Sequence, residues 1–408
     1  MMGELKATLR DAALQRIWSA VLVSTLGNFL LMLSLSVYVW RQTGSNFLAS
    51  AIFAVQWGAI IFSAPLVSRI LQRYPAARTA AFSEWAGGII SLLIGLSISF
   101  LPMVFFLLLL RGFAESLSKS ARVVAMKEAV PTPLLGRAAS LLGTSTFIGI
   151  ALGSLGGALL VDRIAPGWIA VIDSLTFVIS GMLYLSLWRR TPVTDLRPAE
   201  RKGGMCAAWQ TLRGWPDLRR QFVWVLVSTA FLQGFHNVAR TLLPLQLGMG
   251  EQGIMLLQAL ASASFFFGAM AVALLMQGES RNWRSQPWFI SLLSAALLQF
   301  SLLIPSMTAS LVSYALYLFV FEIAFTFCQK NMIVLCPQEY LGAISSAAIS
   351  ASTLGMVAVI AVGGALSDWV GLAATGWIFC ALFLAVLLWV EIPPRLVKGT
   401  VTVREEAE

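Results

Sequence analysis

The sequence predicts an all-α membrane protein with twelve transmembrane helices arranged in two six-helix, pseudo-symmetric halves. The composition, the spacing of apolar stretches and an internal repeat support this fold class. The chain has 408 residues, of which 58% are apolar and only 12% are charged. Soluble domains carry about 25% charged residues, so this composition is typical of a chain that crosses a membrane many times.

The apolar stretches are each long enough to cross a bilayer. A hydrocarbon core of roughly 30 Å needs about 20 helical residues. Short polar breaks such as "RQTGSN" and "GMGEQG" divide the stretches and read as turns. The predicted spans are 17–40, 47–68, 79–101, 103–126, 138–161, 168–188, 221–245, 252–276, 287–304, 307–330, 341–366 and 372–392.

The lysines and arginines predict how the spans are oriented. Most loop cations fall on one side of the predicted membrane, whereas the other side holds only Arg41 and Arg163 at loops. The cations of the basic side, besides eight in the central connection, are Lys6, Arg10, Arg16, Arg69, Arg73, Arg78, Lys119, Arg122, Lys127, Arg137, Arg281, Arg284, Lys330, Arg395, Lys398 and Arg404. The positive-inside rule then places both termini in the cytoplasm of a bacterial-type inner membrane. The net charge of +9 therefore reflects topology, and no nucleic-acid partner is expected.

Several classes of function are not supported by the residues present. The four cysteines form no C-x-x-C pair and the chain has one histidine, so neither a metal site nor a disulfide framework is expected. We find no nucleotide-binding loop and no nucleophile–base pair, which argues against an enzyme and against a cofactor. The first apolar stretch lacks a small-residue cleavage pattern, and we interpret it as a retained helix rather than a signal peptide.

An internal repeat indicates that the two halves arose by duplication. "VLVST" occurs at 21–25 and again at 225–229, and Glu115 has a counterpart in Glu322. "GGALLVD" at 156–162 also matches "GGALSD" at 363–368 with one deletion. The alternative is coincidence between two apolar halves. We therefore expect an N-terminal half at 1–188, a cytoplasmic connection at 189–220, a C-terminal half at 221–394 and a cytoplasmic tail at 395–408.

Four stretches carry a resemblance to a known family, and they lie in the expected order on the twelve-span map. They are "RQTGSNFLAS" after span 1, "IDSLTF" at 172–177, "WQTLRGWPDLRR" at 209–220 and "CPQEYLGAISS" at 336–346. With them the chain resembles the major facilitator superfamily. Within it, the chain looks like the drug–proton antiporter branch, which includes macrolide-efflux-like proteins and enterobactin-type siderophore exporters. In the resembled fold, spans 1, 4, 7 and 10 line a central cavity.

The chain departs from the family pattern at two motifs. "SRILQR" at 68–73 keeps Arg69 and Arg73 as gating candidates but has Ser68 at the acidic place and Leu71 at the glycine. "GIALGSLGGALL" at 149–160 lacks the proline of the antiporter pattern. "GSLGGALLVD" is similar to the lysophospholipid-transporter branch, which keeps that substrate class open.

Span 4 carries three charges on one helical face. Arg111, Glu115 and Lys119 are spaced four apart, so Arg111–Glu115 and Glu115–Lys119 are within pairing reach. Charged groups at this depth cost roughly 2.5–3.5 kcal/mol on insertion scales and normally face a cavity or a partner. We expect Arg111 to contact the substrate and Glu115 to carry a coupling proton. The alternative is a structural ion pair.

Span 10 contains a glutamate with no cation within one helical turn. Glu322 needs a partner from another span or must be protonated, and we expect it to take part in proton coupling. Tyr314, Tyr317 and Phe321 share one stripe of the same helix. We expect Tyr314 and Tyr317 to contact an amphipathic ligand, although such a stripe is also typical of plain packing.

Three further polar residues lie inside predicted spans. Asn28 in span 1 either contacts the substrate or bonds to another helix. Glu84 in span 3 lies near the cytoplasmic end and is expected to meet a loop arginine such as Arg69 or Arg73. Asp173, at the start of span 6, is expected to be a structural or gating residue near the outer surface, not a substrate contact.

Span 7 contains the only histidine. Gln233, His236, Asn237 and Arg240 follow an i, i+3, i+4, i+7 pattern, which places them on one helical face. Because the resemblance places span 7 at the cavity, we expect these four residues to bind substrate and His236 also to titrate. The alternative for His236 is a hydrogen-bonded core histidine.

Together these features predict a proton-coupled secondary transporter that works by alternating access. The expected partners are a small organic molecule, protons and the lipid bilayer, and the chain is expected to be a monomer. Export is inferred from the resemblance alone. The cationic residues favour an anionic or zwitterionic substrate, with a siderophore above a cationic drug. Alternatives are a lysophospholipid flippase and, in another class, a non-transporting sensor or assembly factor.

Overall fold

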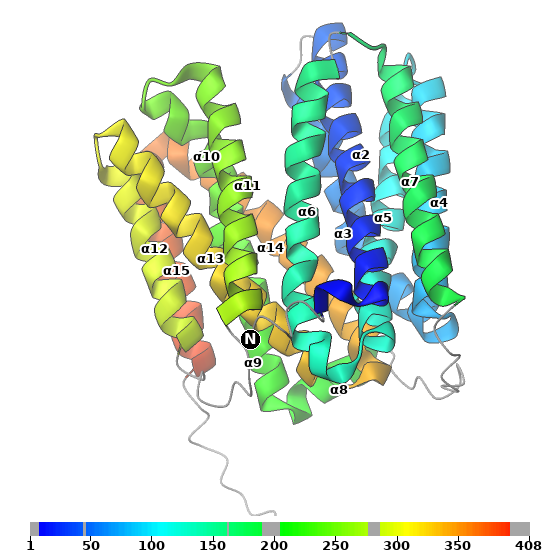
Figure 1. Cartoon of the computed structure of the whole chain (residues 1–408). Helices are drawn as coiled ribbons and strands as arrows, with labels where there is room; N and C mark the ends of the chain where they lie inside the picture. Colours follow the sequence, from blue (N-terminus) through cyan, green and yellow to red (C-terminus); the bar gives the residue numbers. More distant parts are fainter. Residues whose placement is uncertain (1–7, 44–45, 161–162, 190–204, 276–285, 392–408) are drawn as a thin grey trace, which may run out of the picture.

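The computed structural model describes residues 8–43, 46–160, 163–189, 205–275 and 286–391, and these residues are almost entirely helical. The first half of the chain forms six long helices (Figure 1). They are α2 (Ala12–Thr43), α3 (Asn46–Arg73), α4 (Ala76–Leu96), α5 (Leu101–Ala129), α6 (Thr132–Leu160) and α7 (Pro166–Trp188). Each overlaps one of the predicted spans 1 to 6, although α4 ends at Leu96, before the predicted end of span 3 at 101, so the first half of the predicted fold is confirmed.

The second half forms six more spans. The first span is divided into α9 (Pro216–Val227), a π-helical segment η2 (Ser228–Gln233) and α10 (Gly234–Gln246). The others are α11 (Gly250–Leu275), α12 (Gln286–Leu303), α13 (Met307–Leu335), α14 (Gln338–Val370) and α15 (Leu372–Glu391). By length and composition, eleven described helices can cross a membrane, and Pro287–Leu303 is a shorter apolar helix at the predicted position of span 9.

The central connection contains a helix that the sequence did not lead us to expect. Helix α8 (Met205–Gly214) lies between the two halves, and Trp215 separates it from α9. The predicted tail at 395–408 and part of the predicted connection lie outside the described residues. Most helices also extend beyond the predicted spans: α3, for example, runs to Arg73 although its apolar stretch ends near residue 68.

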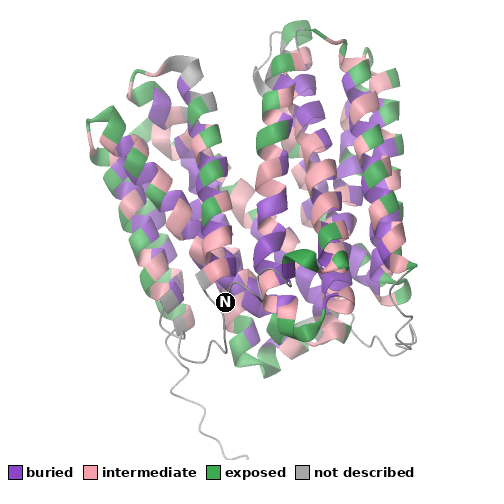
Figure 2. Cartoon of the chain, viewed as in Figure 1, coloured by how far each residue is buried: buried purple, intermediate pink, exposed green. Residues whose placement is uncertain are grey.

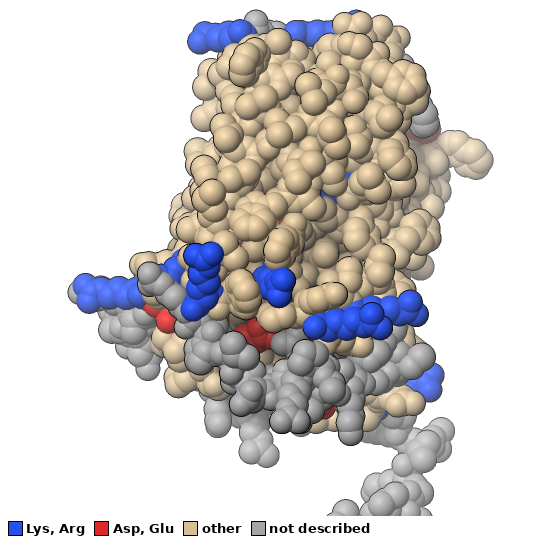
Figure 3. All heavy atoms as spheres, turned by 90° about the vertical axis from the view of Figure 1, so that its right-hand side faces the viewer, with Lys and Arg blue, Asp and Glu red and all other residues tan. Residues whose placement is uncertain are grey.

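The surface between the helix ends is apolar. Large side chains such as Phe62, Leu96 and Trp389 are 83%, 84% and 78% exposed. Figure 2 shows exposed and half-buried residues along the outward faces of the helices, and Figure 3 shows a broad band almost free of charge between two charged ends. A continuous exposed apolar band of this kind is the surface that lipid covers in a membrane protein.

We use the term basic end for the end of the bundle that carries α8, Arg73, Arg78 and the α5–α6 and α13–α14 turns. One hydrophobic cluster lies there and contains residues of both halves, among them Val124 and Leu142 of the first half and Ile333 and Ile344 of the second. The fully buried residues of the other clusters each belong to one half. The two halves therefore share a hydrophobic core at the basic end, and elsewhere Phe147 of α6 packs against the cluster of the second half.

Polar contacts between the halves follow the same distribution. Ser350 of α14 donates a hydrogen bond to the main-chain oxygen of Ile60 in α3 at 2.7 Å. Lys127 of α5 donates to the main-chain oxygen of Ile333 in α13 at 2.8 Å. A side-chain carbon at Gly342 would lie 3.1 Å from Cβ of Leu71, so α14 approaches α3 closely there. The structure is thus closed between the halves at the basic end.

Candidate functional site

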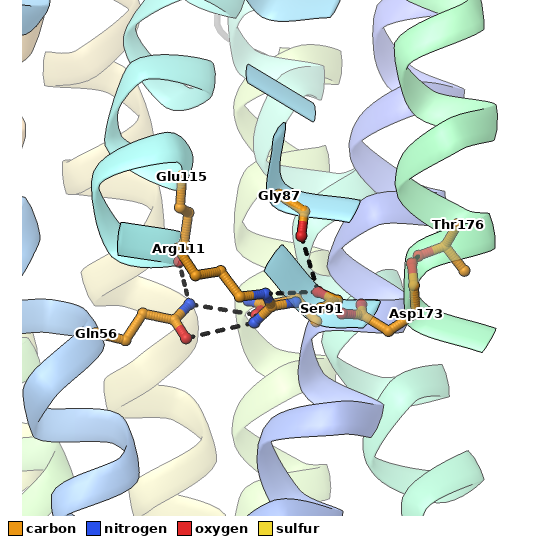
Figure 4. Close-up of polar contacts among 8 residues, drawn as sticks. Gln56, Gly87, Ser91, Arg111, Glu115, Asp173 and Thr176 are labelled. Atoms are coloured by element: carbon orange, nitrogen blue, oxygen red, sulfur yellow. Dashed lines mark hydrogen bonds and ion pairs between the residues drawn. The ribbon is translucent and has the colours of Figure 1, made fainter. Parts of the chain in front are cut away.

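The centre of the first half holds a buried ion pair between α5 and α7. Nη2 of Arg111 lies 2.5 Å from Oδ2 of Asp173, and the two side chains are 1% and 0% exposed (Figure 4). A paired charge at this depth is tolerated because each group satisfies the other, whereas either one alone would be costly. Asp173 is therefore fully buried, two helical turns inside the end of α7 at which we expected it.

Arg111 is bound on several sides by polar groups from other helices. Nη1 donates to Oδ1 of Asn28 in α2 at 2.6 Å and to Oε1 of Gln56 in α3 at 3.4 Å. Nε donates to the hydroxyl of Ser91 in α4 at 3.0 Å, and Ser91 in turn donates to Asp173 at 2.7 Å. Five helices thus converge on one guanidinium group, which fixes its position.

The same network reaches the carboxylate of Glu115. Gln56 donates hydrogen bonds to both Asn28 and Glu115. Lys119 lies 2.5 Å from Glu115, so the predicted pairing of Glu115 with Lys119 is found. The predicted pairing of Arg111 with Glu115 is replaced by the Arg111–Asp173 ion pair, and Gln56 bridges the two charged pairs. Helical spacing alone could not show that α7 supplies a closer carboxylate.

A cavity of about 40 Å³ lies beside this network. Asn28, Arg111, Glu115 and Lys119 are among the residues that line it, and all of its lining residues belong to the first half. Its volume is enough for a few water molecules but is far too small for an organic substrate. In this conformation the site is a small polar chamber rather than an open binding pocket.

Glu84 also lines this cavity, which differs from our expectation of a loop contact. Its side chain is 4% exposed and accepts a hydrogen bond from Ser118 of α5. Arg69 and Arg73, by contrast, are exposed at the basic end. The helical phase of α4 turns Glu84 into the bundle, away from the α3–α4 turn.

In the second half, the histidine is part of the core. Nδ1 of His236 and the hydroxyl of Tyr314 in α13 share a hydrogen bond of 2.7 Å. The imidazole is 4% exposed and meets Phe265 of α11 edge-on, with ring centroids 5.7 Å apart. Tyr317 is also fully buried and donates to the main-chain oxygen of Leu232 at 2.7 Å. Both tyrosines therefore bond to other helices here, which is the packing alternative that the sequence left open.

The predicted polar face of span 7 is divided among different neighbours. Asn237 donates to the main-chain oxygen of Gln233 one turn earlier, at 2.9 Å. Arg240 donates to Gln258 of α11 at 2.5 Å, whereas His236 faces α13. Gln233 and Asn237 are half-buried. The structure does not bring these four residues to the cavity of the first half.

Glu322 lies where the two halves meet. Its carboxyl oxygen accepts a hydrogen bond from Thr326 at 2.6 Å, and the side chain is 2% exposed. A side-chain carbon at Gly268 of α11 would lie 2.7 Å from Cβ of Glu322, and one at Gly143 of α6 would lie 3.8 Å from its carboxyl oxygen. A buried carboxyl group thus packs against Gly268 of its own half and faces the opposite half at Gly143.

The residues at 68–73 that differ from the family motif lie at the basic end. Ser68, at the acidic place of the family motif, is buried and accepts a hydrogen bond from Gln72 at 3.1 Å. Leu71, at the glycine place, is 2% exposed and packs on Gly342 of the opposite half. At this motif the resembled family has charged residues, whereas here the two halves make an apolar contact.

Gln56 and Ser91 are network members that we did not single out from the sequence. Gln56 is the only strongly polar residue in the stretch "AIFAVQWGAIIF", and that isolation was a usable signal. Ser91 carried no such signal, because a serine in a helix commonly bonds to its own backbone. Within the described part of the chain, no three His, Cys, Asp or Glu side chains are grouped to hold a metal ion.

Comparison with solved structures shows the same fold in proteins of very different sequence. The human organic anion transporter MFSD10 (TETRAN) is 16% identical, with a TM-score of 0.73, and the match covers 93% of this chain and 99% of that one. The E. coli fucose:proton symporter is 13% identical, with a TM-score of 0.68 and coverage of 93% and 98%. A bacterial homologue of ferroportin in an outward-facing state is also 13% identical, with a TM-score of 0.66 and coverage of 93% and 99%.

At the level of sequence, the search of curated proteins finds no match to the chain. The profile of one family, described as Major Facilitator Superfamily, matches residues 17–359, which is most of the chain. This match agrees with the two six-helix halves, the shared core at the basic end and the charged network at the centre of the first half. The chain belongs to the major facilitator superfamily.

Proposed function

We propose that this secondary transporter couples the export of a small organic molecule to proton movement, by alternating access between its two halves. The observation that carries the proposal is Glu115, a carboxylate that lines the polar chamber and is held by Lys119 and by Gln56. Protonation of Glu115 would break its pairing with Lys119 and change its bond to Gln56. Because Gln56 also bonds to Asn28, protonation of Glu115 would also change the hydrogen bonds around Arg111.

Glu322 supplies a second protonation site in the other half. Its only hydrogen bond among the described residues comes from Thr326, and no described salt bridge includes it. A carboxyl group that loses its charge can stay buried against α6, whereas a carboxylate favours water. Protonation of Glu322 would then favour the approach of the two halves, and deprotonation would favour their separation.

The substrate that these residues suit is anionic or zwitterionic. Arg111 and Arg240 supply positive charge, and Asn28, Gln233, His236 and Asn237 supply neutral hydrogen-bonding groups around the predicted cavity helices. Tyr314 and Tyr317 become available only if α13 moves relative to α10. A carboxylate-bearing siderophore or a drug-like anion fits this set, and one solved structure of the same fold is named as an organic anion transporter.

The orientation is part of the proposal. We assign the basic end, and both termini, to the cytoplasm of a bacterial-type inner membrane, because Lys and Arg are in excess there. The halves proposed to rock are 1–188 and 221–394, in a monomer. Arg69, Arg73 and Asp173 are proposed to control the motion, the first two from the surface of the basic end and Asp173 through its ion pair with Arg111.

Transport in proteoliposomes tests the proposal. Purified protein is reconstituted and a panel of siderophores, organic anions and cationic dyes is offered with and without an imposed pH gradient. We expect a pH gradient to drive flux of an anionic compound, and Glu115→Gln to abolish this flux while retaining exchange of substrate for substrate. Glu339→Gln, a change at an exposed carboxylate, serves as the matched control.

The alternatives make different predictions in the same vesicles. A lysophospholipid flippase would move a labelled lysolipid between leaflets and none of the soluble compounds. A sensor or assembly factor would move no compound, and neutralising Glu115 or Glu322 would change no flux. Flux of cationic dyes without any anion flux would overturn the substrate class proposed here.

A further inference from the structure

The first half contains a group of buried polar atoms that lack hydrogen-bond partners. Within the described residues, Oε2 of Glu84, Nε of Arg122 and the hydroxyl of Tyr184 each have none, and Oγ of Ser180 interacts with the Glu84 carboxyl group without a hydrogen bond of ordinary geometry. They come from three helices that pack together, α4, α5 and α7. Buried polar atoms in folded proteins are almost always satisfied, by protein or by bound water. Three such atoms in one region would gain partners from water if the adjoining cavity widened toward them.

Glu84 is at the centre of this group. Its other carboxyl oxygen accepts from Ser118, whereas Oε2 is enclosed by protein and has no hydrogen bond of ordinary geometry. Arg122 and Tyr184 both interact electrostatically with the Glu84 carboxyl group. Glu84 and Arg122 line the same 40 Å³ cavity as Glu115. Two carboxyl groups, Glu84 and Glu115, thus share one chamber with room for water between them.

The charges that face Glu84 come mainly from α5. They are Glu115, Lys119, Arg122 and, at the far side of the cavity, Arg111. Helix α7 adds the Tyr184 hydroxyl group. The residues that α2 contributes to the cavity, Ser24, Thr25 and Asn28, are neutral. Glu84 has no salt-bridge partner among the described residues, whereas Glu115 is paired with Lys119 at 2.5 Å.

The two carboxyl groups lie at different depths. Glu84 is eight residues from the basic end of α4 and Glu115 is fourteen from that of α5, which is about 12 Å and about 21 Å along the helices. Glu84 is therefore the carboxyl group nearer to the basic end. A proton that moves from Glu84 to Glu115 would travel from the basic end toward the centre of the protein.

We propose that Glu84 is a second proton-binding site of the first half and exchanges its proton with Glu115 through water in the shared cavity. In this step the Oε2–H bond of Glu84 breaks and a cavity water accepts the proton. That water gives up a proton to the Glu115 carboxylate. Glu84 ends as a carboxylate, Glu115 as a carboxylic acid, and the water is unchanged. The inference rests on the proposed coupling role of Glu115.

Infrared difference spectroscopy on the purified, detergent-solubilised protein tests the proton site without any substrate. The pH is stepped between about 5 and about 9. Exposed carboxyl groups are already mostly ionised at the low end of this range, so they contribute little to the difference spectrum. The carbonyl band of a protonated, buried carboxyl group is followed in H₂O and D₂O. We expect Glu84→Gln to remove one band that titrates within this range, and Glu115→Gln to shift that band through the loss of a neighbouring charge.

Two matched variants separate a proton site from a structural role. Glu84→Asp keeps a carboxyl group and should keep a titrating band at a shifted position. Tyr184→Phe removes the neighbouring hydroxyl group and should shift the band without removing it. Glu339→Gln should leave the buried bands unchanged. A spectrum of Glu84→Gln that keeps every titrating buried band would overturn the inference, provided the variant elutes as a folded monodisperse protein.

The vesicle assay keeps this test separate from that of the transport proposal. If wild-type vesicles show no pH-driven flux but Glu84→Gln loses its band, the proton site stands and the coupling proposal fails. If wild-type vesicles show such flux but the band is unchanged in Glu84→Gln, the coupling proposal stands and the second proton site is wrong.

Discussion

The ammonium group of Lys127 lies 2.8 Å from the main-chain oxygen of Ile333, so a side chain of the first half binds the end of a helix in the second. Lys127 also donates to the main-chain oxygens of Val334 and Cys336. These carbonyls belong to the last turn of α13 and its C-cap, where a helix leaves acceptors unpaired and carries partial negative charge. Lys127 therefore stabilises the closed basic end.

Removing this lysine is expected to open the basic end. Lys127→Met keeps the aliphatic length but removes the donors, whereas Lys127→Arg keeps a cation. Cys336 reports the change, because its thiol is buried in the closed structure. We expect Lys127→Met to increase the rate of maleimide labelling of Cys336 at least several-fold, and Lys127→Arg to label nearly as slowly as the wild type.

The pH dependence of labelling provides a control for the same experiment. Burial raises the pKa of the Cys336 thiol to about 12, and the nearby Lys127 opposes this effect only in part. Because the thiolate is the reactive form, labelling of the closed state should rise about tenfold per pH unit between about pH 7 and about pH 9, without a plateau. A Cys336→Ser variant gives the background from the other cysteines. Equal rates in wild type and Lys127→Met would mean that the lysine does not hold the halves together.

The Arg111–Asp173 ion pair is expected to dominate the stability of the first half. Asp173→Asn leaves a buried guanidinium group without its counter-charge, which typically costs about 3–5 kcal/mol. The double variant Arg111→Gln, Asp173→Asn removes both charges and should recover a large part of this loss. Thermal unfolding of the detergent-solubilised proteins measures the loss of stability in Asp173→Asn, in Arg111→Gln and in the double variant. If the double variant is as unstable as the sum of the single ones, the two residues do not act as a pair.

Gly112 is expected to be essential for the approach of α3 to α5. A side-chain carbon there would lie 2.2 Å from the main-chain oxygen of Gln56, so Gly112→Ala must push the two helices apart. Overpacking of this kind typically costs about 1–3 kcal/mol, and the shift should also weaken the bond between Gln56 and Glu115. Gly58→Ala in α3 is the matched control, since its added carbon meets nothing within 4 Å. Equal melting temperatures for the two variants would contradict this account.

The contact between His236 and Tyr314 is expected to be a stability determinant of the second half. Tyr314→Phe leaves the buried imidazole nitrogen without its partner, which should cost about 1–3 kcal/mol. Tyr74→Phe, at an exposed position, should change stability little. His236→Gln separates the two roles that the sequence left open. A change in the pH dependence of transport with normal abundance supports a titrating role, whereas reduced abundance alone supports a core role.

The arrangement of helices was predictable from the sequence because the composition of each segment shows whether it crosses the membrane. The length of each apolar stretch, the polar breaks and the side of the loop cations were sufficient for twelve spans in two halves. The exact ends of the helices were harder to predict from the sequence. Helix α3 includes Pro65 and continues through "SRILQR" to Arg73, because polar residues remain helical beyond the hydrocarbon core and the next proline comes at position 75.

The polar contacts were predictable only in part. The pairing of Glu115 with Lys119 follows from their spacing along one helix and is present. The partner of Arg111 could not be obtained in this way, because Asp173 lies 62 residues away and reaches it only through the packing of α7. His236 and Arg240 share a helical face in the sequence, yet they contact different helices. Local spacing predicts neighbours on one helix, whereas tertiary packing decides which neighbours are used.

The π-helical segment at Ser228–Gln233 changes how the two halves should be aligned. A π-turn takes up one residue more than an α-turn over the same stretch of helix and is how a single inserted residue is accommodated. The repeated "VLVST" gives an offset of 204 between the halves, and the segment begins inside its second copy. With one insertion the offset becomes 205, and Asn28 of α2 then corresponds to Gln233. In this alignment both halves carry an amide side chain at the same point of their first helix, so the repeat extends further than the offset of 204 alone shows.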